Sequence, residues 1–247
     1  MTTKVVPGML IAVPDGIAVA REAASRLAKL ILDALDAQGQ ASVALSGGGT
    51  PGPAYALLRE DARIDWSKVD VFFVDERAVP PDSPRSNFRM VQEALLDHVS
   101  IPPDRIHRMR GEAADRGAAA REYASQIRAR VRHAETGIPE FDVAVYGVGD
   151  DGHTASLFPG EPSVDVTDRL VIDVPSAAKR EARLSITVPL IEHTRAALIV
   201  AVGKGKQEAL ERIWSTSGDV HHTPGRVLRG VRGSITWVID KAAGGLG

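Results

Sequence analysis

The sequence predicts an α/β fold in which an open, mostly parallel sheet carries helices on both faces. Short apolar runs rich in β-branched residues alternate with longer amphipathic segments, and this alternation is typical of parallel strands joined by helices. The chain has 247 residues, 44% of them hydrophobic, and can therefore bury a sizeable core. That length fits one large domain or two small ones, and we favour a single domain over residues 1–247.

The first half of the chain begins with a long amphipathic helix after a short strand. Apolar residues recur on this helix at helical spacing, at Val19, Ala23, Leu27, Leu30, Ile31 and Leu35. A later helix begins at Pro51, because proline is tolerated in a first helical turn. The expected strands are 9–13, 41–45 and 69–74, and the expected helices are 15–37, 51–60, 86–96 and 112–133.

The second half repeats the alternation. The apolar run 141–146 has the length and composition of a buried strand, and 196–202 is another. The remaining expected elements are short strands at 170–174 and 184–187, a helix at 204–214, and a last strand at 235–239. Residues 215–224 are expected to form a polar loop, and 244–247 a frayed tail.

Composition excludes several classes of function. The formal net charge of −2 gives no electrostatic support for a nucleic-acid or anionic-membrane partner. The absence of cysteine rules out disulfides, thiolate metal sites and a cysteine nucleophile, and it suits a reducing cytoplasm. No apolar run approaches the ~18 residues of a membrane span, and the N-terminus lacks the apolar core of a signal peptide. We therefore expect a cytoplasmic protein.

A glycine-rich turn after the second expected strand is a candidate phosphate site. It comprises Ser46, Gly47, Gly48, Gly49, Thr50 and Pro51. Successive glycine amides followed by a helix favour an anion. The turn lacks the Gly-Lys-Ser/Thr ending of a nucleoside-triphosphate loop, so a monophosphate suits it better. The alternative is a tight turn that binds nothing.

A charged triplet follows the third expected strand. Asp75 can face a polar substrate, and Arg77 can offer its planar guanidinium to a phosphate or to a neighbouring carboxylate. Taken alone, Asp75-Glu76-Arg77 is better explained as a surface ion pair or as a cap for the next segment.

The loop after strand 141–146 carries the most informative chemistry. Gly147, Gly149 and Gly152 spell Gly-x-Gly-x-x-Gly, with candidate ribose-binding acids further on at Asp165, Asp168 and Asp173. A dinucleotide site needs a long helix opening at the third glycine, whereas Pro159 and Gly160 interrupt this segment. Asp151 and His153 suggest an acid–base site instead, because an imidazole with an unperturbed pKa of ~6.5 suits proton abstraction near neutrality.

These segments together resemble the 6-phosphogluconolactonase family. The resemblance covers the chain from about Ala41 to Ala243, and the histidine-centred segment is its most specific part. Its motifs are Ser46-Gly47-Gly48-x-Thr50-Pro51, Asp75-Glu76-Arg77, Val79-Pro80, Ser86-Asn87-Phe88, Gly149-x-Asp151-Gly152-His153-Thr154-Ala155-Ser156-Leu157-Phe158-Pro159-Gly160, Arg183-x-Ser185-x-Thr187, Gly203-x-x-Lys206 and Trp237-x-x-Asp240. Gly49, where the family often has a larger residue, and Gly225 depart from the pattern.

The resemblance implies a Rossmann-like fold of the glucosamine-6-phosphate deaminase type and hydrolysis of 6-phospho-D-glucono-1,5-lactone. It implies His153 as the general base, with Asp151 and Asp75 orienting the imidazole or the sugar. It further implies that the Ser46 to Thr50 amides, Arg183 and Lys206 hold the phosphate, and Arg77 supports the carboxylates or reaches the substrate. The expected partner is a small sugar-phosphate lactone, with no metal and no cofactor. Oligomeric state stays open, with a monomer allowed.

Three other functions compete with lactone hydrolysis. The related deaminases resemble this loop but place a glutamate before the proline, where this chain has Phe158. A nicotinamide-dependent dehydrogenase would use the glycine pattern literally. A non-enzymatic sugar-phosphate sensor would share the anion loop, but it would need an output module, for which we find no spare segment.

Overall fold

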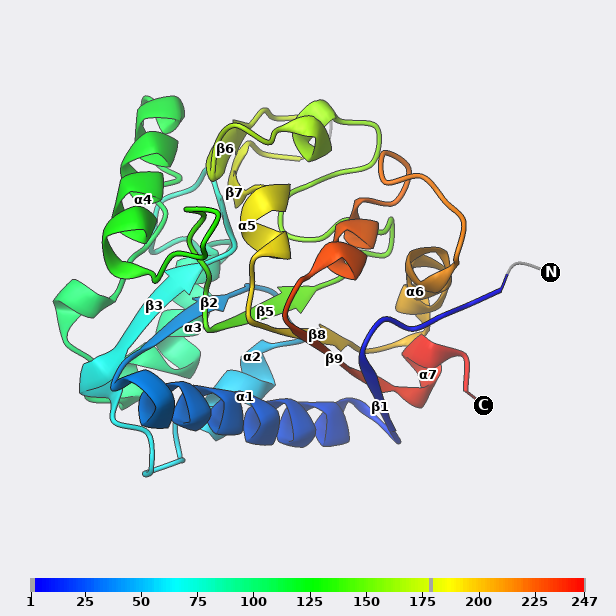
Figure 1. Ribbon diagram of the computed structural model, residues 1–247, viewed down its shortest axis with the longest axis horizontal. Helices are drawn as coiled ribbons and strands as arrows, with labels where there is room; N and C mark the ends of the chain where they lie inside the picture. Colours follow the sequence, from blue (N-terminus) through cyan, green and yellow to red (C-terminus); the bar gives the residue numbers. More distant parts are fainter. Residues whose placement is uncertain (1–2, 178–179, 247) are drawn as a thin grey trace.

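A six-stranded parallel sheet forms the centre of the computed structural model, which describes residues 3–177 and 180–246 (Figure 1). Its strand order is β1-β9-β8-β5-β2-β3, and every neighbouring pair is parallel. The strands are β1 (Met9–Val13), β2 (Ala41–Leu45), β3 (Val69–Phe73), β5 (Val143–Gly147), β8 (Ala196–Ala201) and β9 (Ser234–Asp240). The predicted fold class is therefore confirmed.

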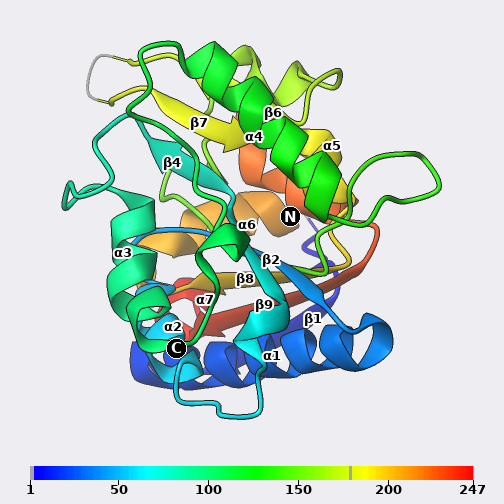
Figure 2. The same cartoon turned by 90° about the vertical axis from the view of Figure 1, so that its left-hand side faces the viewer.

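Helices lie on both faces of this sheet. Helix α1 (Gly16–Gln38) begins where the Asp15 side chain accepts a hydrogen bond from Ala18 N, and it ends at Gly39 in the left-handed region. It packs against β2, β5, β8 and β9. In Figures 1 and 2, α1 and α2 (Gly52–Leu58) lie below the sheet, whereas α4 (Arg116–Arg130) and α5 (Val188–Glu192) lie above it. The central strands are buried on both faces, which explains why they are continuously apolar.

A second, antiparallel sheet was not expected. It has the order β4-β7-β6 and comprises β4 (Asp75–Arg77), β7 (Arg183–Ile186) and β6 (Val171–Val174). The chain leaves β3 through Val74, whose amide donates to Leu45 O and whose carbonyl accepts from Ile186 N. One extended run is thus divided between two sheets. Asp75 and Arg77, which were expected just past the end of a strand, are consequently held by strand pairing.

The boundaries of several predicted elements shift for local reasons. The helix expected at 112–133 is the shorter α4, because the Asp115 side chain caps it by accepting from Ala118 N at 2.8 Å. The helix expected at 204–214 divides into the 3₁₀ turn η5 (Lys204–Lys206) and α6 (Gln207–Trp214). Remaining helical elements are η1 (Trp66–Lys68), α3 (Asn87–Ala94), η2 (Leu96–His98), η3 (Pro103–Arg105), η4 (Pro162–Asp165), η6 (Pro224–Gly230) and α7 (Lys241–Gly244).

Within the described residues, none of the helices combines the length and apolar character needed to cross a membrane. The loops after β2, β5 and β8 all emerge at one edge, since carboxyl ends of parallel strands meet at the same edge of a sheet. The strand β4 starts beside them. Most of the candidate site residues line one cavity at this edge.

Candidate active site

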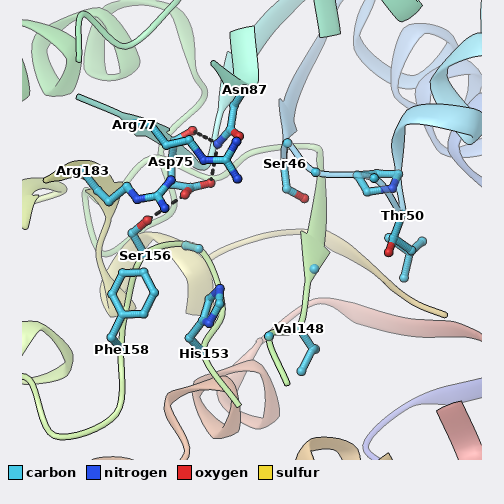
Figure 3. A pocket seen from close by; sticks show the side chains of 18 of the residues that line it. Ser46, Thr50, Asp75, Arg77, Asn87, Val148, His153, Ser156, Phe158 and Arg183 are labelled. Atoms are coloured by element: carbon cyan, nitrogen blue, oxygen red, sulfur yellow. Dashed lines mark hydrogen bonds between the residues drawn. The ribbon is translucent and has the colours of Figure 1, made fainter. Parts of the chain in front are cut away.

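A cavity of about 310 Å³ lies at the carboxyl edge of the parallel sheet (Figure 3). Loops after β2, β5 and β8 line it, together with β4, β7 and the first residue of α3. The predicted site residues that line it are Ser46, Gly47, Gly48, Gly49, Thr50, Asp75, Arg77, His153, Arg183 and Lys206. Asp151 does not line the cavity, but it contacts His153.

The glycine-rich turn offers backbone donors that the protein does not use. Within the described part of the chain, the amides of Gly47, Gly48, Gly49 and Thr50 donate to no protein acceptor. The base of the turn is fixed, because the Ser46 hydroxyl donates to Val145 O at 2.8 Å. Successive free amides form a concave site for an anion.

Each glycine of the turn has a different environment. A Cβ on Gly47 would lie 2.0 Å from Oδ1 of Asn87, so the turn and α3 touch there. Gly48 has φ +100°, which disfavours any other residue. A Cβ on Gly49 would meet nothing within 4 Å. A larger residue at position 49, as in the family pattern, would therefore fit.

Asp75 and Glu76 are adjacent buried carboxylates with different tasks. Asp75 accepts from Ser156 Oγ at 2.7 Å and from Asn87 Nδ2 at 3.1 Å, and it faces the cavity. Glu76 instead accepts from the amides of Asn87 and Phe88 at the start of α3, both at 2.8 Å. Burial raises the pKa of Glu76, although these hydrogen bonds oppose the shift. The sequence interpretation of the triplet as a cap thus applies to Glu76 alone.

The two arginines lie beside Asp75. Figure 3 shows Arg77 and Arg183 grouped with Asp75, well apart from Thr50. Burial lowers the pKa of Arg183, and the charge of Asp75 opposes that shift. Lys206 lines the same cavity but forms an ion pair with a different carboxylate, its Nζ lying 2.6 Å from Oδ1 of Asp150. The family resemblance implied that Arg183 and Lys206 hold the phosphate together, whereas the structure places Arg183 in the electrostatic environment of Asp75.

His153 is oriented by Asp151. Nδ1 of His153 lies 2.6 Å from Oδ1 of Asp151, and the same oxygen accepts from the His153 amide at 3.0 Å. Burial raises the pKa of Asp151, but the hydrogen bonds from His153 outweigh it and leave the pKa below its usual range. An ionised carboxylate can only accept, so Nδ1 carries the proton and Nε2 of a neutral ring keeps its lone pair. The pair can therefore take a proton from a molecule in the cavity.

Close backbone contacts hold the loop that carries His153. Gly149 N donates to His153 O at 2.8 Å, and Gly225 N donates to Gly152 O at 2.7 Å. A Cβ on Gly225 would lie 2.9 Å from that same oxygen, which explains the glycine at this position. Within the described residues, Ala155 is the only non-glycine residue with positive φ, at 47°, and it lines the cavity.

The dinucleotide interpretation has no structural basis in this loop. The next helical element after Gly152 is the short η4, where a long helix would be needed. The candidate ribose-binding acids form ion pairs outside the cavity, since Asp165 pairs with His221, Asp173 with Arg116, and Asp168 with its neighbour Arg169. Across the ranges 3–177 and 180–246, no group of three or more His, Asp or Glu side chains is arranged to hold a metal ion.

Three polar or aromatic lining residues were missing from the predicted site. Asn87, Ser156 and Phe158 all belong to motifs that carried the resemblance, yet no role was assigned to them. Asn87 and Ser156 hold Asp75, and Phe158 places its ring 4.7 Å from that of His153. These contacts are made between segments distant in sequence, so only the motifs themselves could have indicated the residues.

The chain is similar to known proteins in family, sequence and structure. Residues 14–237 match the family described as glucosamine-6-phosphate isomerases/6-phosphogluconolactonase. A 6-phosphogluconolactonase from Synechocystis is 40% identical over 215 residues, covering 87% of this chain and 88% of that protein. The structure of a 6-phosphogluconolactonase from Trypanosoma cruzi has a TM-score of 0.85 at 29% identity, covering 98% of this chain and 97% of that one.

A monomeric glucosamine-6-phosphate deaminase also shares the fold. Its structure has a TM-score of 0.79 at 20% identity and covers 97% of this chain and 100% of its own. At that identity the likeness shows the fold alone. The choice between the two activities therefore depends on the residues of the site.

Proposed function

Because the chain belongs to the glucosamine-6-phosphate isomerase/6-phosphogluconolactonase family, we propose that it hydrolyses 6-phospho-D-glucono-1,5-lactone to 6-phosphogluconate, the second step of the oxidative pentose phosphate pathway. The observation that carries the proposal is that His153, oriented by Asp151, lines the same cavity as the unused amides of the glycine-rich turn. His153 can act as a general base, and the free amides of the turn can bind a phosphate.

The chemical step needs one activated water. Nε2 of His153 takes a proton from the water as its oxygen attacks C1 of the lactone, forming a tetrahedral intermediate. When the bond between C1 and the ring oxygen breaks, the imidazolium returns the proton to that oxygen. Asp151 keeps the ring in the required tautomer and stabilises the charged form between the two transfers.

The cavity has two ends, the glycine-rich turn at one and Asp75 with its two neighbouring arginines at the other, and each end binds a different part of the substrate. The amides of the turn from Gly47 to Thr50 hold the phosphate, and Lys206 adds a positive charge. Arg183 and Arg77 lie by Asp75, so they act on the sugar and on the developing negative charge at C1. Arg183 is thus proposed to contact the lactone ring of the substrate, where the family resemblance implied a contact with its phosphate.

Phe158 favours the lactonase over the deaminase. Its aromatic ring packs against His153, at the position where the deaminase pattern has a glutamate. With Phe158 at this position, the chain lacks the carboxylate that would partner the histidine in opening the ring of an amino sugar. Lactone hydrolysis needs no second carboxylate at that position.

The test compares the wild-type protein with His153→Ala on freshly generated 6-phosphogluconolactone, corrected for spontaneous opening. We expect rapid hydrolysis that falls by about 10³-fold in the variant, within the range of general-base catalysis. Glucosamine 6-phosphate serves as the second substrate, and ammonia release from it would move the assignment to the deaminases. A wild-type protein inactive on the lactone would refute the proposal.

A further inference from the structure

The aromatic ring of Phe158 contacts both the proposed general base, His153, and the half-buried guanidinium of Arg180. Its centroid lies 4.7 Å from that of the His153 ring, with the planes inclined at 45°. The guanidinium carbon of Arg180 lies 3.8 Å from the same centroid, over the face of the ring. Phe158 lines the cavity beside His153, as Figure 3 shows, whereas Arg180 is not among the lining residues.

Arg180 is itself held firmly in place. Its side chain is only 14% exposed, and its guanidinium forms an ion pair with Glu161. Its amide and carbonyl also bond to Ala177, at 3.0 and 2.9 Å. The loop that carries His153, residues 148–160, ends next to Glu161. The ion pair with Arg180 therefore connects the end of this histidine loop to the segment before β7. A partly desolvated cation over an aromatic face is attracted more strongly than an exposed one.

The imidazole needs a second constraint besides Asp151. One hydrogen bond to Nδ1 fixes a single edge of the ring but leaves the ring free to tilt about that bond. A packed aromatic surface beside the ring limits this tilt. The direction of the Nε2 lone pair is therefore set by Asp151 and Phe158 together.

We propose that Arg180 is a positioning residue that holds Phe158 against His153 and so fixes the angle at which the general base meets the attacking water. The proposal depends on the lactonase function described above. It assigns Arg180 no contact with the substrate. Loss of Arg180 should therefore lower kcat and leave KM nearly unchanged, because the phosphate-binding turn lies elsewhere in the cavity.

A double-mutant cycle tests the proposal through kcat for lactone hydrolysis. Arg180→Met and Phe158→Leu should each lower kcat by about tenfold, with KM changed less than about twofold. If Arg180 acts through Phe158, the double variant should be no slower than Phe158→Leu alone. Arg169→Met is the matched control, because Arg169 is an exposed arginine paired with Asp168. Phe158→Tyr keeps the ring and should retain most of the activity.

A second measurement does not depend on activity. The carbon-bound ring protons of His153 should show a ring-current shift from Phe158 in NMR spectra of the wild-type protein, and Arg180→Met should reduce it. Multiplicative losses of kcat in the double variant, or an unchanged His153 signal in Arg180→Met, would overturn the proposal. A wild-type protein inactive on the lactone would refute the proposed function, while the NMR result would still decide whether Arg180 holds the stack.

Discussion

The two ends of the cavity differ in how their polar groups are satisfied. At the carboxylate end, Asp75 already accepts hydrogen bonds from Asn87 and Ser156. At the glycine end, the amides of the turn that begins at Gly47 have no protein acceptor within the described residues. Because unpaired donors are costly once they are desolvated, the glycine end favours an anionic ligand, whereas the carboxylate end keeps its geometry without one.

This difference separates the expected effects of mutation. Changes at the carboxylate end should disturb the geometry of catalysis and the stability of the fold, because its hydrogen bonds are part of the folded structure. Changes at the glycine end should mainly alter KM, because its donors are used only when the substrate is bound. Four substitutions test this separation.

The largest effect is expected for Asp75→Ala. The change leaves Ser156 Oγ without its acceptor, leaves Asn87 Nδ2 with only the carbonyl oxygen of residue 75, and removes the negative charge next to Arg183. We expect kcat/KM to fall by about 100-fold or more, since small displacements of reacting groups are costly. Steady-state kinetics on the lactone measure the effect, with the exposed Asp82→Ala as control. An unchanged kcat would contradict the assignment of Asp75 to the geometry of catalysis.

Glu76→Gln should reduce stability and its dependence on pH. The side-chain NH₂ of the glutamine would face groups that now donate hydrogen bonds to Glu76, such as Ser86 Oγ and Phe88 N. We expect this to lower the free energy of unfolding by about 2 kcal/mol. Because burial raises the pKa of Glu76 above its ordinary 4.5, its protonation favours the folded state at low pH. This contribution is lost as pH rises from 4.5 through the raised value.

Urea unfolding of both proteins between pH 4 and pH 8 measures this contribution. The free energy of unfolding of the wild-type protein minus that of Glu76→Gln should decrease as pH rises. A difference that stays constant over the whole range would contradict the raised pKa.

Gly47→Ala should act mainly on substrate binding. The new methyl group would lie 2.0 Å from Oδ1 of Asn87, so the turn must shift to accommodate it. We expect KM to rise by about tenfold, equivalent to about 1.4 kcal/mol, with a smaller change in kcat. Competitive inhibition by inorganic phosphate should weaken in parallel. If kcat fell instead with KM unchanged, the two ends would not be separable.

The smallest effect is expected for Gly49→Ala. A Cβ there meets nothing within 4 Å, and Gly49 is not among the residues with positive φ. The turn should keep its shape and its free amides, so KM and thermal stability should stay within error of the wild-type values. This variant is the matched control for Gly47→Ala, and a large rise in KM would show that the turn tolerates no side chain at all.

The sequence predicted the parallel sheet well because its strands are short apolar runs buried on both faces. It also predicted that the glycine-rich turn and the His153 loop would meet, since both follow strands of that sheet. It did not predict β4, because Asp75-Glu76-Arg77 has no apolar signal and pairs with the distant β7. For the same reason the contacts of Asn87 with Asp75, and the place of Arg183 beside it, required the structure.

The position of β9 has a consequence for the order of folding. Among the residues that the structure describes, β1 pairs only with β9 in the sheet, and β9 lies between β1 and β8. The contact of Gly225 with Gly152 likewise joins the histidine loop to a segment much later in the chain. During synthesis on the ribosome, β1 therefore has no paired strand until the chain has been made as far as β9. Such long-range closure is slow and leaves an unpaired strand edge open to association with other chains until β9 emerges.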